Sequence, residues 1–262
     1  MGSDATPAVA RKSKGLRIAF RIVAIVAGVL ALVFSIPFEV ISITTSGIEQ
    51  IHRVHNMAGA TGFGLMLGLA LVLAGWRPEK QIAAFQMALV AAVAFIIAGV
   101  LSGDPANAGS IVIVVILAIL IALHPDRRAV FTFKVAVSIP LLVPSLLAAV
   151  PAIAYALTQA HLQKVGMVVA PHSPHVEMMH YESMAAVSLE IFLVSLLAAC
   201  RTQGWRVVAW TVAVSAILLG LVSVVYSDFE SAFDSPWSWL AIVWGVVFLG
   251  VTEWQTRQEV AG

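Results

Sequence analysis

Gln81 to Gly103 reads QIAAFQMALVAAVAFIIAGVLSG, a run of 23 residues without a charged side chain. A helix of roughly 20 apolar residues crosses a bilayer core about 30 Å thick, so this run predicts a transmembrane helix. Seven more apolar blocks lie between charges or histidines: Ile22 to Phe38, Asn56 to Trp76, Pro105 to Leu123, Val135 to Ala160, Ser183 to Ala199, Val207 to Ser227 and Ser235 to Thr252. The sequence therefore predicts an all-α integral membrane protein with eight transmembrane helices.

The whole composition supports the same class. The chain is 60% hydrophobic and 11% charged, whereas a soluble domain has roughly 25% charged residues. The net charge of +1 gives no indication of a nucleic-acid partner. The single cysteine, Cys200, excludes an internal disulfide, a CxxC redox pair and a thiolate metal cage. The expected partner is the lipid bilayer, with a quinone or other membrane subunits as further candidates.

Orientation follows from the basic residues, which accumulate in cytoplasmic loops. With the N-terminus inside, all but Arg53 and Lys164 of the 15 lysines and arginines fall on the inner side. The prediction is a multi-pass protein of a cell (inner) membrane with both termini cytoplasmic. Residues 1–15 are expected to form a short cytoplasmic tail.

Two related halves are predicted, covering residues 16–128 and 129–262. A shift of 125 residues places His55 on His180 and overlays residues 57–75 on residues 182–200. Both segments are rich in small residues. Each half would contain four helices, so the copies would be related by an axis along the membrane normal.

Histidines are concentrated on the predicted outer side of the membrane. Only His124 falls inside; the others are His52, His55, His161, His172, His175 and His180. Neutral imidazole is the commonest protein metal ligand. The densest stretch, from residue 172 to residue 180, gives the candidate metal ligands His172, His175, His180 and Glu182. Ligand sets of His and Met suit copper, whereas sets of His and Glu suit zinc or non-haem iron.

The helical periodicity limits how these residues can combine. If the sixth helix begins at Pro174, a step of 100° per residue puts His175, Glu182 and Glu190 on one stripe and His180 roughly opposite, so they cannot all bind one ion. The alternative interpretation is that these are interfacial polar residues at a helix end. His52 and His55, about 60° apart on the second helix, can both face the bundle. We expect one of them to approach His175 or His180 near the outer surface.

Glu190 lies two turns into the sixth apolar block. An ionised carboxylate inside a bilayer costs at least about 2–3 kcal/mol unless it is paired or protonated. We therefore expect Glu190 to face the bundle interior, and we assign it as a candidate catalytic acid.

The segment from Gly47 to Arg53, GIEQIHR, resembles the Glu-x-x-His-Arg signature of haem A synthases. That family also has eight helices in two related halves with both ends cytoplasmic. The resemblance implies that His52 is an axial haem ligand and that Glu49 is the acid beside it, which makes Glu49 a second candidate catalytic residue. His175 or His180 would be the match in the second half. The chain lacks the histidines that the family carries at the outer ends of helices four and eight.

Three functions remain open from the sequence. The first is a redox-linked site between helices two and six that binds haem b or a transition metal (Cu, Zn or Fe), with His52, His55, His175 and His180 as cofactor ligands. The second is a transporter for a small solute or cation, favoured by the repeat, by Glu190 and by the prolines of the fifth helix. The third is a membrane anchor or assembly subunit. Whether the protein is an enzyme stays open.

Overall fold

The computed structural model describes residues 7–44, 52–104, 108–132 and 137–261. Within these ranges all the regular structure is helical. The elements are α1 (Pro7–Thr44), α2 (Arg53–Gly59), the π-helix η2 (Ala60–Leu69), α3 (Ala70–Trp76), α4 (Ile82–Ser102), α5 (Ala108–Leu123), α6 (Arg127–Val130), α7 (Ile139–Val169), α8 (Pro174–Glu177), α9 (His180–Ala199), α10 (Trp205–Val225) and α11 (Trp237–Ala261).

Seven of the helical segments in the described ranges are long and apolar enough to cross a membrane: Lys14–Ser35, Arg53–Trp76, Ile82–Ser102, Ile139–Val169, His180–Ala199, Trp205–Val225 and Trp237–Glu259. The remaining predicted span corresponds to α5, whose 16 residues fall short of that length. The class of multi-pass helical membrane protein is thus supported, while the count of eight spans stays a prediction. Helix α1 begins at Pro7, inside the predicted tail of residues 1–15.

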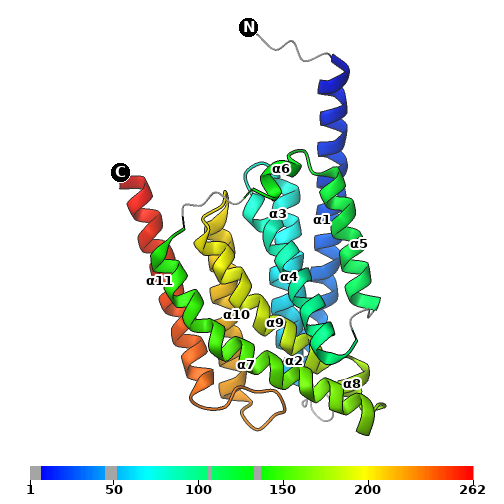
Figure 1. Cartoon of the computed structure of the whole chain (residues 1–262), viewed down its shortest axis with the longest axis vertical. Coiled ribbons are helices and arrows are strands. Elements are labelled where there is room, and N and C mark those ends of the chain that lie inside the picture. The colour runs from blue at the N-terminus through cyan, green and yellow to red at the C-terminus, as the bar shows by residue number, and fades with distance from the viewer. Residues whose placement is uncertain (1–6, 45–51, 105–107, 133–136, 262) are drawn as a thin grey trace.

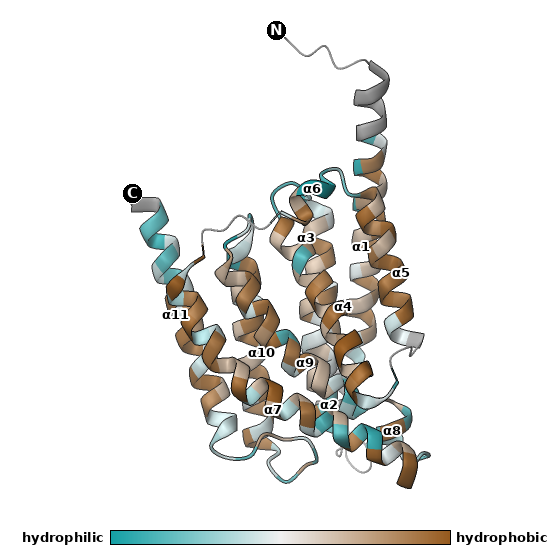
Figure 2. Ribbon diagram, viewed as in Figure 1, coloured by the Kyte–Doolittle hydropathy of each residue, from teal (hydrophilic) through white to brown (hydrophobic). Residues whose placement is uncertain are grey.

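The helices form a bundle in which the two ends of the chain lie at the same end of the molecule, and α2 and α8 lie at the other (Figure 1). Figure 2 shows that hydrophobic residues predominate along the long helices, and many of their large apolar side chains are exposed. On α7, for example, Leu147 and Val150 are 70% and 73% exposed. Such a surface suits lipid rather than water. Helix α9 is the most enclosed of the seven spans, because 72% of its apolar window is buried, against 22% for α1 and α11.

The second span is not a regular α-helix. It begins as α2, continues as the ten-residue π-helix η2 and ends as α3. Helix α1 packs very closely against it: a Cβ atom added at Gly28 would lie 2.6 Å from the carbonyl oxygen of Gly68. Glycine on this face lets the two backbones approach, as small residues do between membrane helices.

The sixth predicted helix is broken near its start, which the sequence analysis did not anticipate. Ser173 caps α8 by accepting a hydrogen bond from the Val176 backbone, but α8 ends after one turn. Met179 then adopts a left-handed conformation with φ of 54°, and α9 begins at His180. The N-terminal end of this span is therefore a short helix joined to a long one through a sharp turn.

Candidate metal centre

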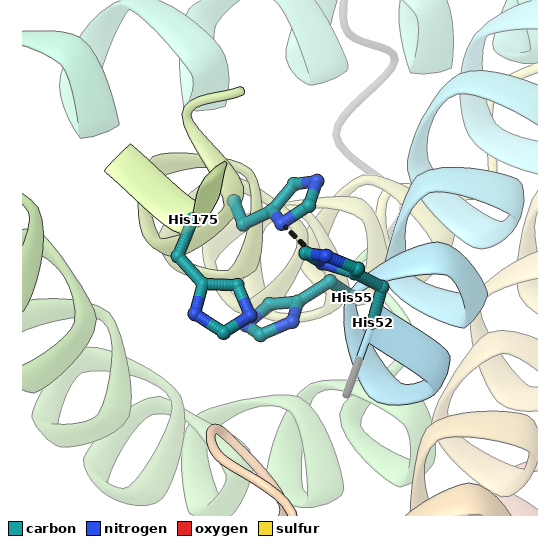
Figure 3. A group of neighbouring side chains, drawn as sticks. His52, His55 and His175 are labelled. Carbon is teal, nitrogen blue, oxygen red and sulfur yellow. Dashed lines mark hydrogen bonds between the residues drawn. The ribbon is translucent and has the colours of Figure 1, made fainter. Parts of the chain in front are cut away.

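Four histidines converge at the end of the bundle away from the chain termini. One possible ligand atom from each of His52, His55, His175 and His180 lies within 4.8 Å of the others. His52 and His55 are buried, with exposures of 8% and 3%, and the other two are half-buried. His52 directly precedes α2 and His55 lies in it, whereas His175 and His180 belong to α8 and α9. Figure 3 shows the rings of His52, His55 and His175 gathered close together. The predicted approach of the second and sixth helices through their histidines is confirmed.

The four rings form a quadrilateral in which each α2 histidine lies beside both histidines of the α8–α9 segment. Its sides, measured between ring centroids, are 4.8 Å and 4.7 Å from His52 to His175 and His180, and 4.9 Å from His55 to each of them. The diagonals are 6.4 Å between His52 and His55, and 5.6 Å between His175 and His180. This close, four-sided arrangement is compatible with tetrahedral donation to one ion.

The break in the sixth helix explains how His175 and His180 reach the same site. On a continuous helix five residues turn through about 500°, which places the two side chains on nearly opposite faces. The left-handed turn at Met179 reverses that relation. The predicted placement of His175 and His180 on roughly opposite stripes was therefore wrong, because it assumed a single helix from Pro174; their ring centroids lie 5.6 Å apart.

Two of the imidazoles contact each other directly. Nδ1 of His52 and Nδ1 of His180 are 3.1 Å apart, a hydrogen-bond distance. One ring must donate a proton there and the other accept it, so both are not protonated at these atoms together. A bound cation would replace that proton and bring both lone pairs toward itself.

His175 is oriented by a carboxylate from the loop between α10 and α11. Its Nδ1 lies 3.1 Å from an oxygen of Glu230. Its Nε2 is buried and has no hydrogen-bond partner among the described residues. A metal-binding histidine commonly donates its other ring N–H to a carboxylate, which fixes the tautomer and raises the basicity of the ligand atom. Glu230 thus prepares Nε2 of His175 for a cation.

His55 is held by a hydrogen-bonded chain from the same loop. Its Nε2 lies 3.0 Å from Oγ of Ser231, whose hydroxyl donates to Oε1 of Gln159 over 2.8 Å. Because that hydroxyl proton is used on Gln159, Ser231 accepts the proton of Nε2, and Nδ1 of His55 carries the lone pair. Tyr155 also donates to the Ser231 carbonyl oxygen at 2.5 Å. These contacts hold Ser231 at a φ of 66°, an unfavourable region for serine.

The other predicted site residues lie elsewhere. His172 is exposed and pairs with Glu177 at 3.1 Å, so it is not a fifth ligand in this structure. Glu182 is buried but is not part of the four-residue group. Glu190 is fully buried, as predicted, on the same helix as His180. Glu49 lies outside the described residues.

His124, predicted on the inner side, belongs to a separate packing cluster. Its ring lies edge-on to Phe20 at 4.7 Å and stacks on Phe85 at 5.4 Å. Its Nδ1 accepts a hydrogen bond from the Asp126 backbone. Burial lowers the pKa of His124, so the neutral ring is favoured there. This histidine stabilises a helix end and has no connection to the four-histidine group.

Glu230, Ser231, Gln159 and Tyr155 were not predicted as site residues. Ser231 and His55 are 176 positions apart in the chain, so no local spacing links them. The contact that gives each of these residues its role depends on the tertiary packing of α7, α9 and α10.

Comparisons of the chain with protein-family models, with curated proteins and with solved structures give no match. The geometry of the site thus carries the functional inference.

If the four histidines hold a metal ion, replacing Glu230 with glutamine should weaken its binding by about 10–100-fold, the range typical of a partner that orients a metal ligand. The amide keeps the size of the side chain but removes the charge that polarises His175. Competition with a chromogenic chelator measures the change. The matched control is Glu177→Gln, which removes an exposed carboxylate bonded to His172; equal losses in both variants would contradict the role of Glu230.

Proposed function

We propose that this chain is a multi-pass membrane protein that binds one transition-metal ion through His52, His55, His175 and His180. The observation that carries the proposal is the grouping of four possible ligand atoms within 4.8 Å. Zn–N bonds of 2.0–2.1 Å in a tetrahedron set the nitrogens about 3.3–3.4 Å apart. The largest separation thus needs to contract by about 1.4 Å, which is within the reach of side-chain rotation.

Zinc is the cation that fits this ligand set best. Imidazole suits zinc, copper, iron and nickel, and four ligands in a tetrahedron are typical of zinc. The four rings lie too close together for haem, since a macrocycle between two axial nitrogens about 4 Å apart would need the space that the other two rings fill. We therefore propose a metal ion in place of haem b.

Binding or transfer of the ion is favoured over catalysis on it. A catalytic zinc keeps one coordination position open for water or substrate, whereas four protein ligands close the coordination sphere. A closed site stores, senses or hands on the ion. The closed coordination sphere supports the transport alternative over a redox enzyme.

The proposed orientation puts the site on the outer side of a cell membrane. Both ends of the chain lie at the same end of the bundle (Figure 1), which requires an even number of crossings. Counting α5 as the eighth crossing satisfies this requirement. The basic loops and termini would then face the cytoplasm, with the four histidines at the opposite surface.

The direct test is elemental analysis of the purified chain after zinc loading and dialysis. We expect one zinc ion per chain near neutral pH. The histidines must be neutral to bind the ion, so protons compete with zinc for them as the pH is lowered. Zinc occupancy should consequently decrease as the pH is lowered. Substoichiometric zinc at neutral pH, or occupancy that does not change on acidification, would contradict the four-histidine assignment.

A further inference from the structure

Glu190 is a carboxylic acid enclosed by the bundle at mid-depth. Its side chain is fully buried, and neither carboxyl oxygen has a hydrogen-bond partner among the described residues. It follows His180 by ten residues, which is about 15 Å along a helix. Since the hydrocarbon core is about 30 Å thick, Glu190 lies near its centre when His180 marks the outer boundary. An ionisable residue at this depth is by default a functional group.

The carboxyl group faces the π-helical part of the second span. A Cβ atom added at Gly62 would lie 3.1 Å from Oε2 of Glu190 and 2.7 Å from Cγ2 of Val187. Only glycine leaves room for the acid against this backbone. A π-helix inside an α-helical span is frequently found at functional sites, and η2 extends over ten residues. The π-helix η2 and the buried carboxyl group of Glu190 therefore lie at the same depth in the bundle.

The same two chain segments carry the four-histidine site and Glu190. The second span contributes His52 and His55 and then Gly62, and α9 contributes His180 and then Glu190. Any movement of α9 along or away from η2 therefore changes the geometry of the four-histidine site and the surroundings of Glu190 together. The carboxylate is the next ionisable group inward from the histidines on α9 after Glu182.

We propose that Glu190 is an intramembrane exchange site, which holds a proton when empty and releases it when the ion from the four-histidine site reaches it. This inference rests on the proposed function. One divalent ion replaces one proton on the carboxyl group, so the occupied site has one positive charge and the proton leaves toward the opposite side. The substrate class is a divalent transition-metal ion, moved in exchange for protons.

The experiment uses the full chain in liposomes, with zinc added outside and with zinc- and pH-sensitive dyes that report both fluxes. We expect coupled zinc and proton movement in the wild type. In Glu190→Gln both fluxes should fall to the level of protein-free liposomes, while the zinc affinity of the separate four-histidine site, measured in detergent, should stay unchanged because Glu190 is not one of its ligands. The control Glu177→Gln, an exposed acid, should behave as the wild type. Coupled fluxes that persist in Glu190→Gln would overturn the proposal.

A second measurement, chemical modification of Glu190, uses the wild-type protein and needs no variant. Dicyclohexylcarbodiimide, an apolar reagent, modifies protonated carboxyl groups within membranes. Mass spectrometry of the wild type should find the adduct on Glu190, and zinc should protect against it. No adduct on Glu190 would overturn the inference. A wild type that binds one zinc ion but moves none would also overturn it and leave the proposed function standing, whereas absence of zinc binding would remove the proposed function itself.

Discussion

Replacing His180 with alanine is expected to abolish stoichiometric zinc binding. His180 lies at the corner of the site where its Nδ1 is 3.1 Å from Nδ1 of His52 and its ring stacks on His55 at 4.9 Å. Its loss leaves three imidazoles and an open position. The effect should exceed the 10–100-fold typical of residues that only orient a ligand. Elemental analysis and chelator competition measure it.

His172→Ala is the matched control, because this histidine lies in the same segment. Its imidazole is exposed and bonded to Glu177, outside the four-residue group. Zinc stoichiometry and affinity should be those of the wild type. If His172→Ala lost zinc while His180→Ala retained it, the assignment of the ligands would be wrong.

Gly28→Ala should be the most destabilising single-methyl change on α1. The added Cβ would lie 2.6 Å from the Gly68 carbonyl oxygen and 2.8 Å from the Val72 amide nitrogen. Both are backbone atoms, so relief requires α1 to move away from the second span. Overpacking of this kind costs about 1–3 kcal/mol. The change should appear as a lower midpoint of thermal unfolding in detergent micelles.

Gly250→Ala provides the comparison on α11, because no atom lies within 4 Å of its added Cβ. Alanine is favoured over glycine inside a helix by roughly 0.5–1 kcal/mol, so this variant should melt at or slightly above the wild-type temperature. Equal midpoints for Gly28→Ala and the wild type would show that α1 does not pack on η2 as the structure has it.

The fold class could be predicted because lipid imposes it on the sequence. A run such as residues 81–103 has no charged group to place in water, and it forms α4. The count of spans was less certain for a physical reason: α5 is short, with 16 residues. Periodicity also gave no indication of the π-helix η2, since the hydrophobic pattern of a span that is apolar on every face does not distinguish helix types.

The candidate site was predicted in part. The second and sixth helices were expected to meet through their histidines, and they do. The assumption that the sixth helix is continuous from Pro174 was wrong. Glycine often indicates a left-handed turn in a sequence, whereas the methionine that makes this turn, Met179, gives no such indication. The roles of Glu230 and Ser231 depend on a loop that folds back over α2 and α8. Only tertiary packing brings that loop to the histidines.

The alternating order of the four rings has a mechanical consequence. Each side of the quadrilateral joins the second span to the α8–α9 segment, so a bound ion would crosslink two parts of the chain that lie 125 positions apart from His55 to His180. An ion at a concentration 100 times its dissociation constant adds about 2.7 kcal/mol to the stability of the form that binds it. If the second span and the α8–α9 segment separate, all four of these contacts between histidine rings are lost together. Under the proposed function, a bound ion would hold the two segments together, and its release would allow them to separate.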